Sequence, residues 1–262
     1  MKTMFTYQIK SLLFVLLISS IMFSCESKKN KEASNIFPSL INKYSKISEK
    51  IEKNSKKLSL YQKYNENNSM LELVNAKYKS GLEINRYRYK TSLYAYSEFS
   101  TSRDSSYNKF NKSEFAYQVT DYIVVLSDKY IYTISLALCD LDKLGIKPKT
   151  DIKIPKSKFD SVINSEKLFI NDDKVFPFFK SYLKRERQYK NTIIHTMESF
   201  KKDDVSMKEL TDFISKQKIT ETTDKYIIFS IEDEEALFLW NKKLNILFLN
   251  FSETDLEKIK KI

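Results

Sequence analysis

The sequence contains very little glycine, because Gly81 and Gly145 are the only two glycines among 262 residues. Dinucleotide-binding Rossmann folds and phosphate-binding P-loops each need several glycines within a few residues, so both are excluded. The many tight turns of an all-β protein also usually demand glycine. This composition therefore points away from common nucleotide-binding folds and disfavours an all-β fold.

Histidine and cysteine are equally scarce. His195 is the only histidine, which gives poor support to a serine protease-like triad, a cysteine–histidine dyad or a typical zinc site. We expect His195 to lie on the solvated side of a helix. The two cysteines are Cys25 and Cys139. Because Cys139 lies in an apolar run, it is expected to be a buried, unreactive thiol. No cofactor or metal is predicted.

Arginine is rare for so basic a chain. The formal net charge is +11, yet only five of the basic residues are arginines. Arginine is the side chain that binds phosphate and guanine through two parallel hydrogen bonds, so a nucleic-acid partner is not predicted. The lysine excess instead favours weak attraction to anionic lipid or polysaccharide.

The first residues carry an export pattern. Lys2 and Lys10 precede an uncharged apolar stretch over residues 12–23. A positive segment followed by an apolar run of this length is typical of a secretory signal, and the run is short for a membrane span. Residues 1–24 are therefore left out of the predicted fold.

This stretch ends in Ile21-Met22-Phe23-Ser24-Cys25, a small residue directly before a cysteine. The segment resembles the lipobox of bacterial lipoproteins, which implies cleavage before Cys25 and acyl chains on its thiol. Residues 25–35 then form the lipidated cysteine and a polar tether. Glu26, rather than aspartate, follows the cysteine, which favours the outer over the inner membrane. If Cys25 is an ordinary thiol, residues 1–24 form a plain signal or an uncleaved anchor.

The body is predicted to be mainly α with a small β-containing C-terminal part, an α+β arrangement of long antiparallel amphipathic helices followed by a short antiparallel sheet. Apolar residues recur at helical spacing in several segments. The predicted helices span residues 36–65, 69–96, 113–144, 159–168 and 178–200. Residues 122–138 are also compatible with two buried strands. A helical bundle over residues 36–146 and a second part over residues 156–262 follow, or one continuous domain.

The C-terminal third has clearer local signals. Ser206 with Glu209 forms a capping box, so a helix is predicted to begin at Met207. Short runs of strand-forming residues at 226–231, 236–240 and 245–251 predict a small sheet. Ser252 with Asp255 caps a final helix, whose Leu256 and Ile259 can cover one face of that sheet. No internal repeat is visible.

Two groups of residues are candidates for an interaction or catalytic site. The first combines cations with tyrosines on one predicted helix, and comprises Arg86, Tyr87, Lys90 and Tyr94. Exposed tyrosines beside cations are suited to glycan or protein contacts; alternatively, both tyrosines pack against a neighbouring helix. The second is the acidic cluster Glu232, Asp233, Glu234 and Glu235, which is also explained as a charged loop between two strands.

These observations favour a lipid-anchored cell-envelope protein, on the periplasmic or surface side, that acts as a non-enzymatic binding module. Its partner would be a protein or a surface polymer, and an immunity or inhibitor role is one version. The alternative is an envelope hydrolase that uses a carboxylate pair, which would come from the acidic cluster. The shortage of catalytic residue types makes the enzyme the weaker hypothesis.

Overall fold

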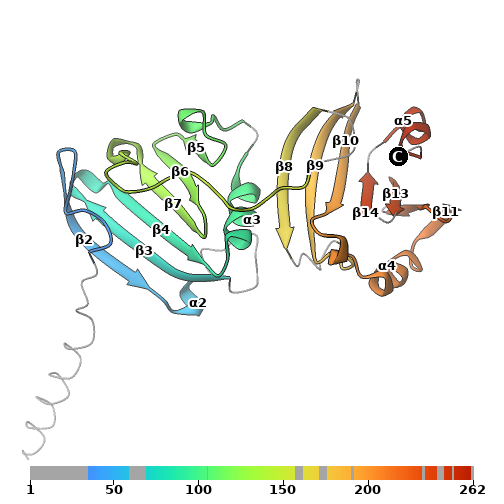
Figure 1. Ribbon diagram of the computed structural model, residues 1–262, viewed down its shortest axis with the longest axis horizontal. Helices are drawn as coiled ribbons and strands as arrows, with labels where there is room; N and C mark the ends of the chain where they lie inside the picture. Colours follow the sequence, from blue (N-terminus) through green and yellow to red (C-terminus); the bar gives the residue numbers. More distant parts are fainter. Residues whose placement is uncertain are drawn as a thin grey trace, which may run out of the picture. The chain divides into compact units, whose positions relative to one another are not determined.

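The protein consists mostly of two antiparallel β-sheets (Figure 1). The computed structural model describes residues 35–58, 69–104, 106–156, 162–170, 176–189, 192–231, 234–240, 245–249 and 251–260. Both sheets belong to one compact unit, Leu40–Ile262. The proposed signal segment, Cys25 and most of the tether lie outside the described residues. No helix in the described part of the chain is both long and apolar enough to cross a membrane.

The first sheet has the strand order β1-β2-β3-β4-β7-β6-β5. Its strands are β1 (Leu40–Ile41), β2 (Tyr44–Glu52), β3 (Met70–Tyr78), β4 (Glu83–Tyr89), β5 (Ala116–Val119), β6 (Tyr122–Ser127) and β7 (Tyr130–Ser135). The second sheet has the order β11-β12-β13-β14-β10-β9-β8. Its strands are β8 (Val162–Ile170), β9 (Ser181–Tyr189), β10 (Thr192–Ser199), β11 (Lys218–Thr222), β12 (Tyr226–Ile231), β13 (Glu234–Trp240) and β14 (Asn245–Leu249).

The helices are short. The α-helices are α2 (Ser55–Leu58), α3 (Ser92–Ser102), α4 (Met207–Ile214) and α5 (Glu253–Ile259), and the 3-10 turns are η2 (Lys79–Gly81), η3 (Phe110–Lys112), η4 (Leu136–Leu138) and η5 (Lys202–Asp204). Helix α3 packs on one face of the first sheet, where Leu73, Tyr87, Ile131 and Leu126 form a row across four strands.

The second sheet is apolar on both faces. On one face Phe178, Phe229 and Phe238 are fully buried in a large aromatic cluster that includes residues of α4. On the other face Ile228 and Phe248 pack with Ile259 of α5. Successive residues of a strand point to opposite faces, so a strand buried on both faces reads as a continuous apolar run.

The two sheets share one topology that the sequence did not reveal. In each, a meander of consecutive strands is followed by a helix and then by a second meander. The last strands of the two meanders pair, as β4 with β7 and as β10 with β14. The helix between the meanders is α3 in the first sheet and α4 in the second. The fold therefore contains a structural repeat.

The predicted mainly α fold is wrong. Strands occupy most of the segments in which long helices were expected over 36–65, 69–96, 113–144, 159–168 and 178–200. The misread strands mix apolar and charged residues, as β2 and β4 show. Apolar residues three, four or seven positions apart can be found in such a mixture, and this spacing resembles that of an amphipathic helix. The alternative of two strands within 122–138 is confirmed by β6 and β7.

The scarcity of glycine did not prevent a β fold, because other residues make the turns. Asn42, Ser80, Thr120 and Asp128 have positive φ angles of 52°, 66°, 41° and 52° at four tight hairpin connections of the first sheet, and Gly81 follows Ser80 in one of them. Among non-glycine residues, Asn and Asp tolerate this left-handed conformation best. Glycine count alone was therefore a poor guide to fold class.

The C-terminal predictions are confirmed. Helix α4 begins at Met207, and the Ser206 hydroxyl accepts a hydrogen bond from the Glu209 amide. Strands β12, β13 and β14 lie where the short apolar runs predicted them. Ser252 and Asp255 cap α5 reciprocally, each side chain accepting from the other residue's amide. The segment Asn241-Lys242-Lys243 between the last two runs, which is suited to a hairpin turn, lies outside the described residues.

Candidate binding site

Four of the five arginines form two Arg-x-Arg pairs, one in each sheet. Arg86 and Arg88 lie on β4, and Arg185 and Arg187 lie on β9. Residues two apart in a strand share a face, so each pair presents two guanidinium groups side by side. The two pairs differ in the acids that surround them.

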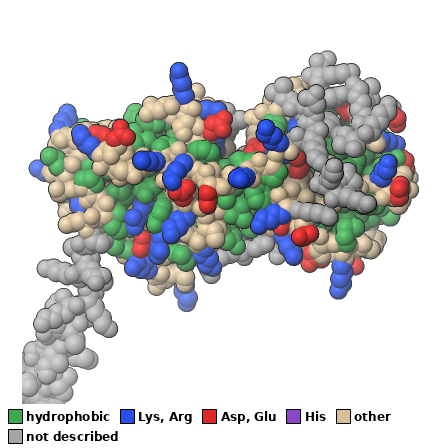
Figure 2. Space-filling view, in the orientation of Figure 1, with side chains coloured by type: hydrophobic (Ala, Val, Ile, Leu, Met, Phe, Trp, Pro, Cys, Tyr) green, Lys and Arg blue, Asp and Glu red, His purple; other side chains and the backbone are tan. Residues whose placement is uncertain are grey.

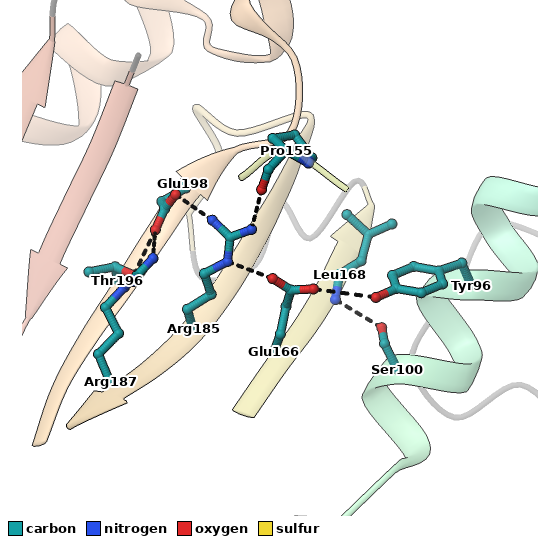
Figure 3. Close-up of polar contacts among 9 residues, drawn as sticks. All are labelled: Tyr96, Ser100, Pro155, Glu166, Leu168, Arg185, Arg187, Thr196 and Glu198. Atoms are coloured by element: carbon teal, nitrogen blue, oxygen red, sulfur yellow. Dashed lines mark hydrogen bonds and ion pairs between the residues drawn. The ribbon is translucent and has the colours of Figure 1, made fainter. Parts of the chain in front are cut away.

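In the second sheet the pair is enclosed and matched by carboxylates (Figure 3). Arg185 is 1% exposed. Its Nε donates to Glu166 at 2.6 Å, and its Nη1 and Nη2 donate to Glu198 and to the Pro155 carbonyl oxygen, each at 2.5 Å. Each of the three guanidinium nitrogens therefore donates to an acceptor within the protein.

Arg187 is 0% exposed and shares the same glutamate. Its Nη2 donates to Glu198 and its Nε donates to Thr196 at 3.0 Å. Burial lowers the pKa of Arg187, while Glu198 opposes that shift. Two arginines face two carboxylates, so this buried cluster is charge-balanced, as a stable buried ion network requires.

The balanced cluster adjoins the junction between the sheets (Figure 3). Glu166 accepts a hydrogen bond from the Tyr96 hydroxyl of α3 at 3.4 Å. Beside it, Ser97 donates to the Leu168 carbonyl at 2.7 Å, and Ser100 accepts from the Leu168 amide at 2.9 Å. Helix α3 thereby satisfies backbone groups on the outer edge of β8. A covered edge strand is protected from pairing with other chains, so we assign this cluster a structural role.

In the first sheet the arginine pair lies on the face opposite α3 and has only one carboxylate. Arg86 Nη2 contacts Glu72 Oε1 at 2.8 Å, and Arg88 Nε lies 3.7 Å from the same oxygen. Lys53 Nζ lies 3.8 Å from Glu72 Oε2. Within the described chain, Arg86, Arg88 and Lys53 form no other ion pair. Three cations thus share one acid, which leaves an excess of two positive charges.

The two arginines of this site are incompletely hydrogen-bonded. The side chains of Arg86 and Arg88 are 18% and 34% exposed, and that of Glu72 is 9% exposed. Among the described residues, the Nε atoms of both arginines are buried without an acceptor, and the Arg88 side chain donates no hydrogen bond. A buried donor without an acceptor costs about 1–3 kcal/mol, so an added acceptor would stabilise this site.

Two tyrosines of the neighbouring strand complete the site. In the register of β4 and β7, Tyr130 lies opposite Arg88 and Tyr132 opposite Arg86. The Arg86 guanidinium lies 5.2 Å from the Tyr130 ring centroid, and the two rings are 6.2 Å apart. Burial raises the pKa of Tyr132, while Arg86 opposes that shift. We call Lys53, Glu72, Arg86, Arg88, Tyr130 and Tyr132 the cationic–aromatic site.

The structure separates the residues of the predicted cation–tyrosine surface. Tyr87 and Tyr94 pack against the core beneath α3, and Arg86 points to the other face of the sheet. Lys90 is exposed just beyond β4, and its amide donates to the Ser69 carbonyl. On a helix, Tyr87 and Tyr94 would share a face, but here one lies in a strand and the other in α3. The tyrosines beside the arginines are Tyr130 and Tyr132, which sequence spacing did not find.

The predicted acidic cluster spans the connection between β12 and β13. Glu232 and Asp233 lie outside the described residues. Glu234 and Glu235 are exposed at the start of β13, and as neighbours in a strand they point to opposite faces. No group of three or more metal-ligating side chains occurs in the described chain.

His195 occupies different surroundings from those expected, whereas Cys139 differs from its expectation only in being partly rather than fully buried. His195 lies in β10 rather than a helix, opposite Glu186 and Leu249, and its Nδ1 is buried without a hydrogen-bond partner among the described residues. Cys139 follows η4 as a partly buried free thiol. Burial and then Asp140 raise the pKa of the Cys139 thiol, which lowers its reactivity.

Basic residues also occur far from the cationic–aromatic site. Figure 2 shows lysine and arginine side chains scattered over the visible surface, interspersed with acidic and hydrophobic ones. The overall charge therefore does not identify a binding site, whereas the local excess of positive charge around Glu72 does.

Comparison of the chain with protein-family models, with curated proteins and with solved structures gives no match in any of the three. What the protein does therefore has to be inferred from its own side chains.

Proposed function

We propose that this chain is a lipid-anchored cell-envelope protein that acts as a non-enzymatic binding module for a protein or a surface polymer. The lipobox-like segment ending at Cys25 supports the anchor. The observation that supports binding is the excess of two positive charges around Glu72. The buried arginine pair of the second sheet is balanced by two glutamates, whereas this partly exposed pair shares one, which leaves a position for an acidic group of a partner.

An envelope hydrolase gains no support from Glu234 and Glu235, the two acids of the cluster that the structure describes. Glycosidases need two carboxyl groups that face one substrate across about 5–10 Å. Glu234 and Glu235 point to opposite faces of a strand, so they do not form such a pair. An immunity or inhibitor role stays one version of the binding function, with outer-membrane attachment as the proposed location.

The anchor is tested by replacing Cys25→Ser in the full chain. We expect no acyl labelling and a precursor that the lipoprotein peptidase leaves uncut, because the thiol is the acylation site. Metabolic labelling with a fatty acid and fractionation of the envelope measure both. Normal labelling and membrane attachment of the variant would contradict the proposal.

The binding function is tested by site-specific crosslinking in the intact envelope. Ile51 is 38% exposed and shares a sheet face with the cationic–aromatic site, whereas Met207 is 52% exposed on α4. A photo-crosslinking residue at Ile51 should give an adduct that Arg88→Gln removes. The same residue at Met207 should give no Arg88-dependent adduct. Failure to obtain an Arg88-dependent adduct at Ile51 would contradict binding at this site.

The control variant is Arg103→Gln, which removes the same charge elsewhere. Arg103 lies just after α3, and its Nη1 is 3.5 Å from the Glu114 carbonyl oxygen. The adduct at Ile51 should persist in this variant. Equal loss in both variants would show that only net charge matters.

A further inference from the structure

The second sheet shows what the arginine pair of the first sheet lacks. Arg185 and Arg187 contact two carboxylates, Glu166 and Glu198, whereas Arg86 and Arg88 contact only Glu72. Building on the binding function proposed above, we infer that a carboxylate of a ligand fills the second position, and that the ligand is an acidic polysaccharide. Arg88 is the main contact residue, because its guanidinium is the one without a hydrogen bond in the described chain.

The guanidinium group of Arg88 is suited to a carboxylate. Two adjacent N–H donors of arginine match the two oxygens of a carboxylate in a planar fork. Its buried Nε lies 3.7 Å from Glu72, too far for a hydrogen bond. A ligand carboxylate beside Arg88 would accept from this group and reduce the local positive charge.

The position of the site favours a polysaccharide over an extended peptide. Strand β4 lies between β3 and β7, so both of its edges are already paired. A peptide therefore cannot add to the sheet beside Arg88 by main-chain hydrogen bonds, which is the usual way an extended segment binds a sheet. The ligand instead meets the partly exposed side chains of Arg88 and Tyr130, beside a part of the same sheet face that is buried.

The aromatic part of the site fits a sugar ring. Tyr130 and Tyr132 lie on the same face of β7 as the arginines, and their side chains are only partly exposed. Tyrosine combines a large apolar ring with a hydroxyl group and loses little conformational entropy on binding. It can contact the C–H face of a sugar while Arg88 holds the acid group.

A polymer of acidic sugars also compensates for the small size of the site. One carboxylate contact on a partly exposed face is weak, because exposed ion pairs contribute little. Repeated acid groups on one chain, presented to many protein molecules on a membrane surface, raise the apparent affinity by multivalency. Membrane anchoring of many protein molecules and a ligand with repeated acid groups therefore both contribute to the apparent affinity.

The inference is tested with the full chain in non-ionic detergent micelles and defined polymers as probes. Polygalacturonate, dextran and poly-glutamate provide an acidic polysaccharide, a neutral polysaccharide and an acidic polypeptide. We expect binding to polygalacturonate at least tenfold tighter than to the other two. Arg88→Gln should weaken that binding at least tenfold, and Arg103→Gln should change it less than twofold. Thermal unfolding curves confirm that both variants are folded.

Other outcomes would overturn the inference. Equal affinity for poly-glutamate and polygalacturonate would indicate charge recognition without a sugar, and equal loss in both variants would place binding elsewhere. If no acidic polysaccharide binds while the Ile51 adduct still depends on Arg88, the binding function stands and the polysaccharide ligand is wrong. If both fail, the binding function fails with it.

Discussion

The two sheets of this protein have the same topology and contain the same Arg-x-Arg motif, yet they use it in opposite ways. Arg185 and Arg187 are buried and matched by two glutamates. Arg86 and Arg88 are partly exposed and share Glu72 with Lys53. Because buried charges are tolerated only when paired, the cluster around Arg185 and Arg187 must be complete. The cluster around Arg86 and Arg88 can remain incomplete because solvent or a ligand compensates its charge.

The comparison also shows how the sheets are joined. The balanced cluster lies beside β8, whose outer edge is covered by α3 of the first sheet. Seven consecutive residues of α3, from Ala95 to Thr101, are buried. A helix buried all round normally belongs to a core, so α3 serves both sheets at once. The arginine cluster that stabilises the fold is thus at the junction. The incomplete one is partly exposed, on a sheet face where its neighbours Val74 and Ile84 are buried.

The largest expected effect concerns Glu198 of the balanced cluster. Glu198→Gln leaves two buried arginines with one remaining carboxylate, so we expect the free energy of unfolding to fall by about 3 kcal/mol or more. Urea unfolding followed by circular dichroism measures the change. The matched control is Glu114→Gln, because Glu114 has a 73% exposed side chain in an ion pair with Lys109. Its effect should be close to zero. A small effect of Glu198→Gln would mean that the cluster is not a structural element.

The next largest effect concerns the junction. Replacing Ser97→Ala and Ser100→Ala together removes both hydrogen bonds to the Leu168 backbone. Because these backbone groups are buried, we expect a loss of about 2 kcal/mol and faster amide hydrogen exchange at Leu168. Hydrogen exchange read by nuclear magnetic resonance or mass spectrometry tests this. Ser215→Ala is the control, since its hydroxyl donates only within the α4 turn, to Asp212. Unchanged protection at Leu168 would contradict the edge-covering role of α3.

Alkaline pH should affect the first sheet before the second. Burial raises the pKa of Tyr78 in β3 and of Tyr117 in β5 to about 12, against 10 in the unfolded chain. A raised folded-state pKa contributes stability below pH 10 that is lost as the pH rises to about 12. The difference in tyrosinate absorbance between the wild type and a Tyr78→Phe, Tyr117→Phe variant reports these two groups, and fluorescence of Trp240, the only tryptophan, reports β13. We expect the tyrosinate transition at lower pH, and coincident transitions would show that the sheets unfold together.

How much of this fold can be predicted from the sequence depends on which faces of each sheet are covered by other parts of the protein. Strands β12 to β14 were predicted because they combine dense strand-forming residues with clear turns between them. Strands β3 and β4 were misread as a helix, partly because Ser69-Met70-Leu71-Glu72 also fits the Ser-x-x-Glu pattern of a helix capping box. In the structure Glu72 instead binds Arg86. A local capping pattern and a cross-strand ion pair use the same residue types, so only the tertiary structure separates them.

The candidate site was predicted in part. The run from Arg86 to Lys90 attracted attention for its cations and tyrosines, and Arg86 does belong to the cationic–aromatic site. The aromatic members, Tyr130 and Tyr132, are more than 40 residues further along the chain, and only the pairing of β4 with β7 brings them close. Spacing two apart in Arg86 and Arg88 would have indicated a shared face if the segment had been recognised as a strand.

The smallest expected effect comes from giving the arginine pair of the first sheet a second carboxylate, as the arginine pair of the second sheet already has. Tyr130 lies opposite Arg88, so Tyr130→Glu places a second carboxylate beside the unsatisfied guanidinium. We expect a gain of no more than about 1 kcal/mol in the free energy of unfolding, because the pair stays partly exposed. The same variant should lose binding to polygalacturonate at least tenfold, since its own acid occupies the ligand position.

The neutral variant Tyr130→Gln separates these effects. It removes the same ring without adding a charge, so it should bind polygalacturonate more weakly than the wild type but more tightly than Tyr130→Glu. Thermal unfolding and titration of both variants measure stability and affinity together. If Tyr130→Glu were less stable than Tyr130→Gln, Arg88 would not be short of an acceptor, and the contrast between a completed and an incomplete arginine pair would no longer hold.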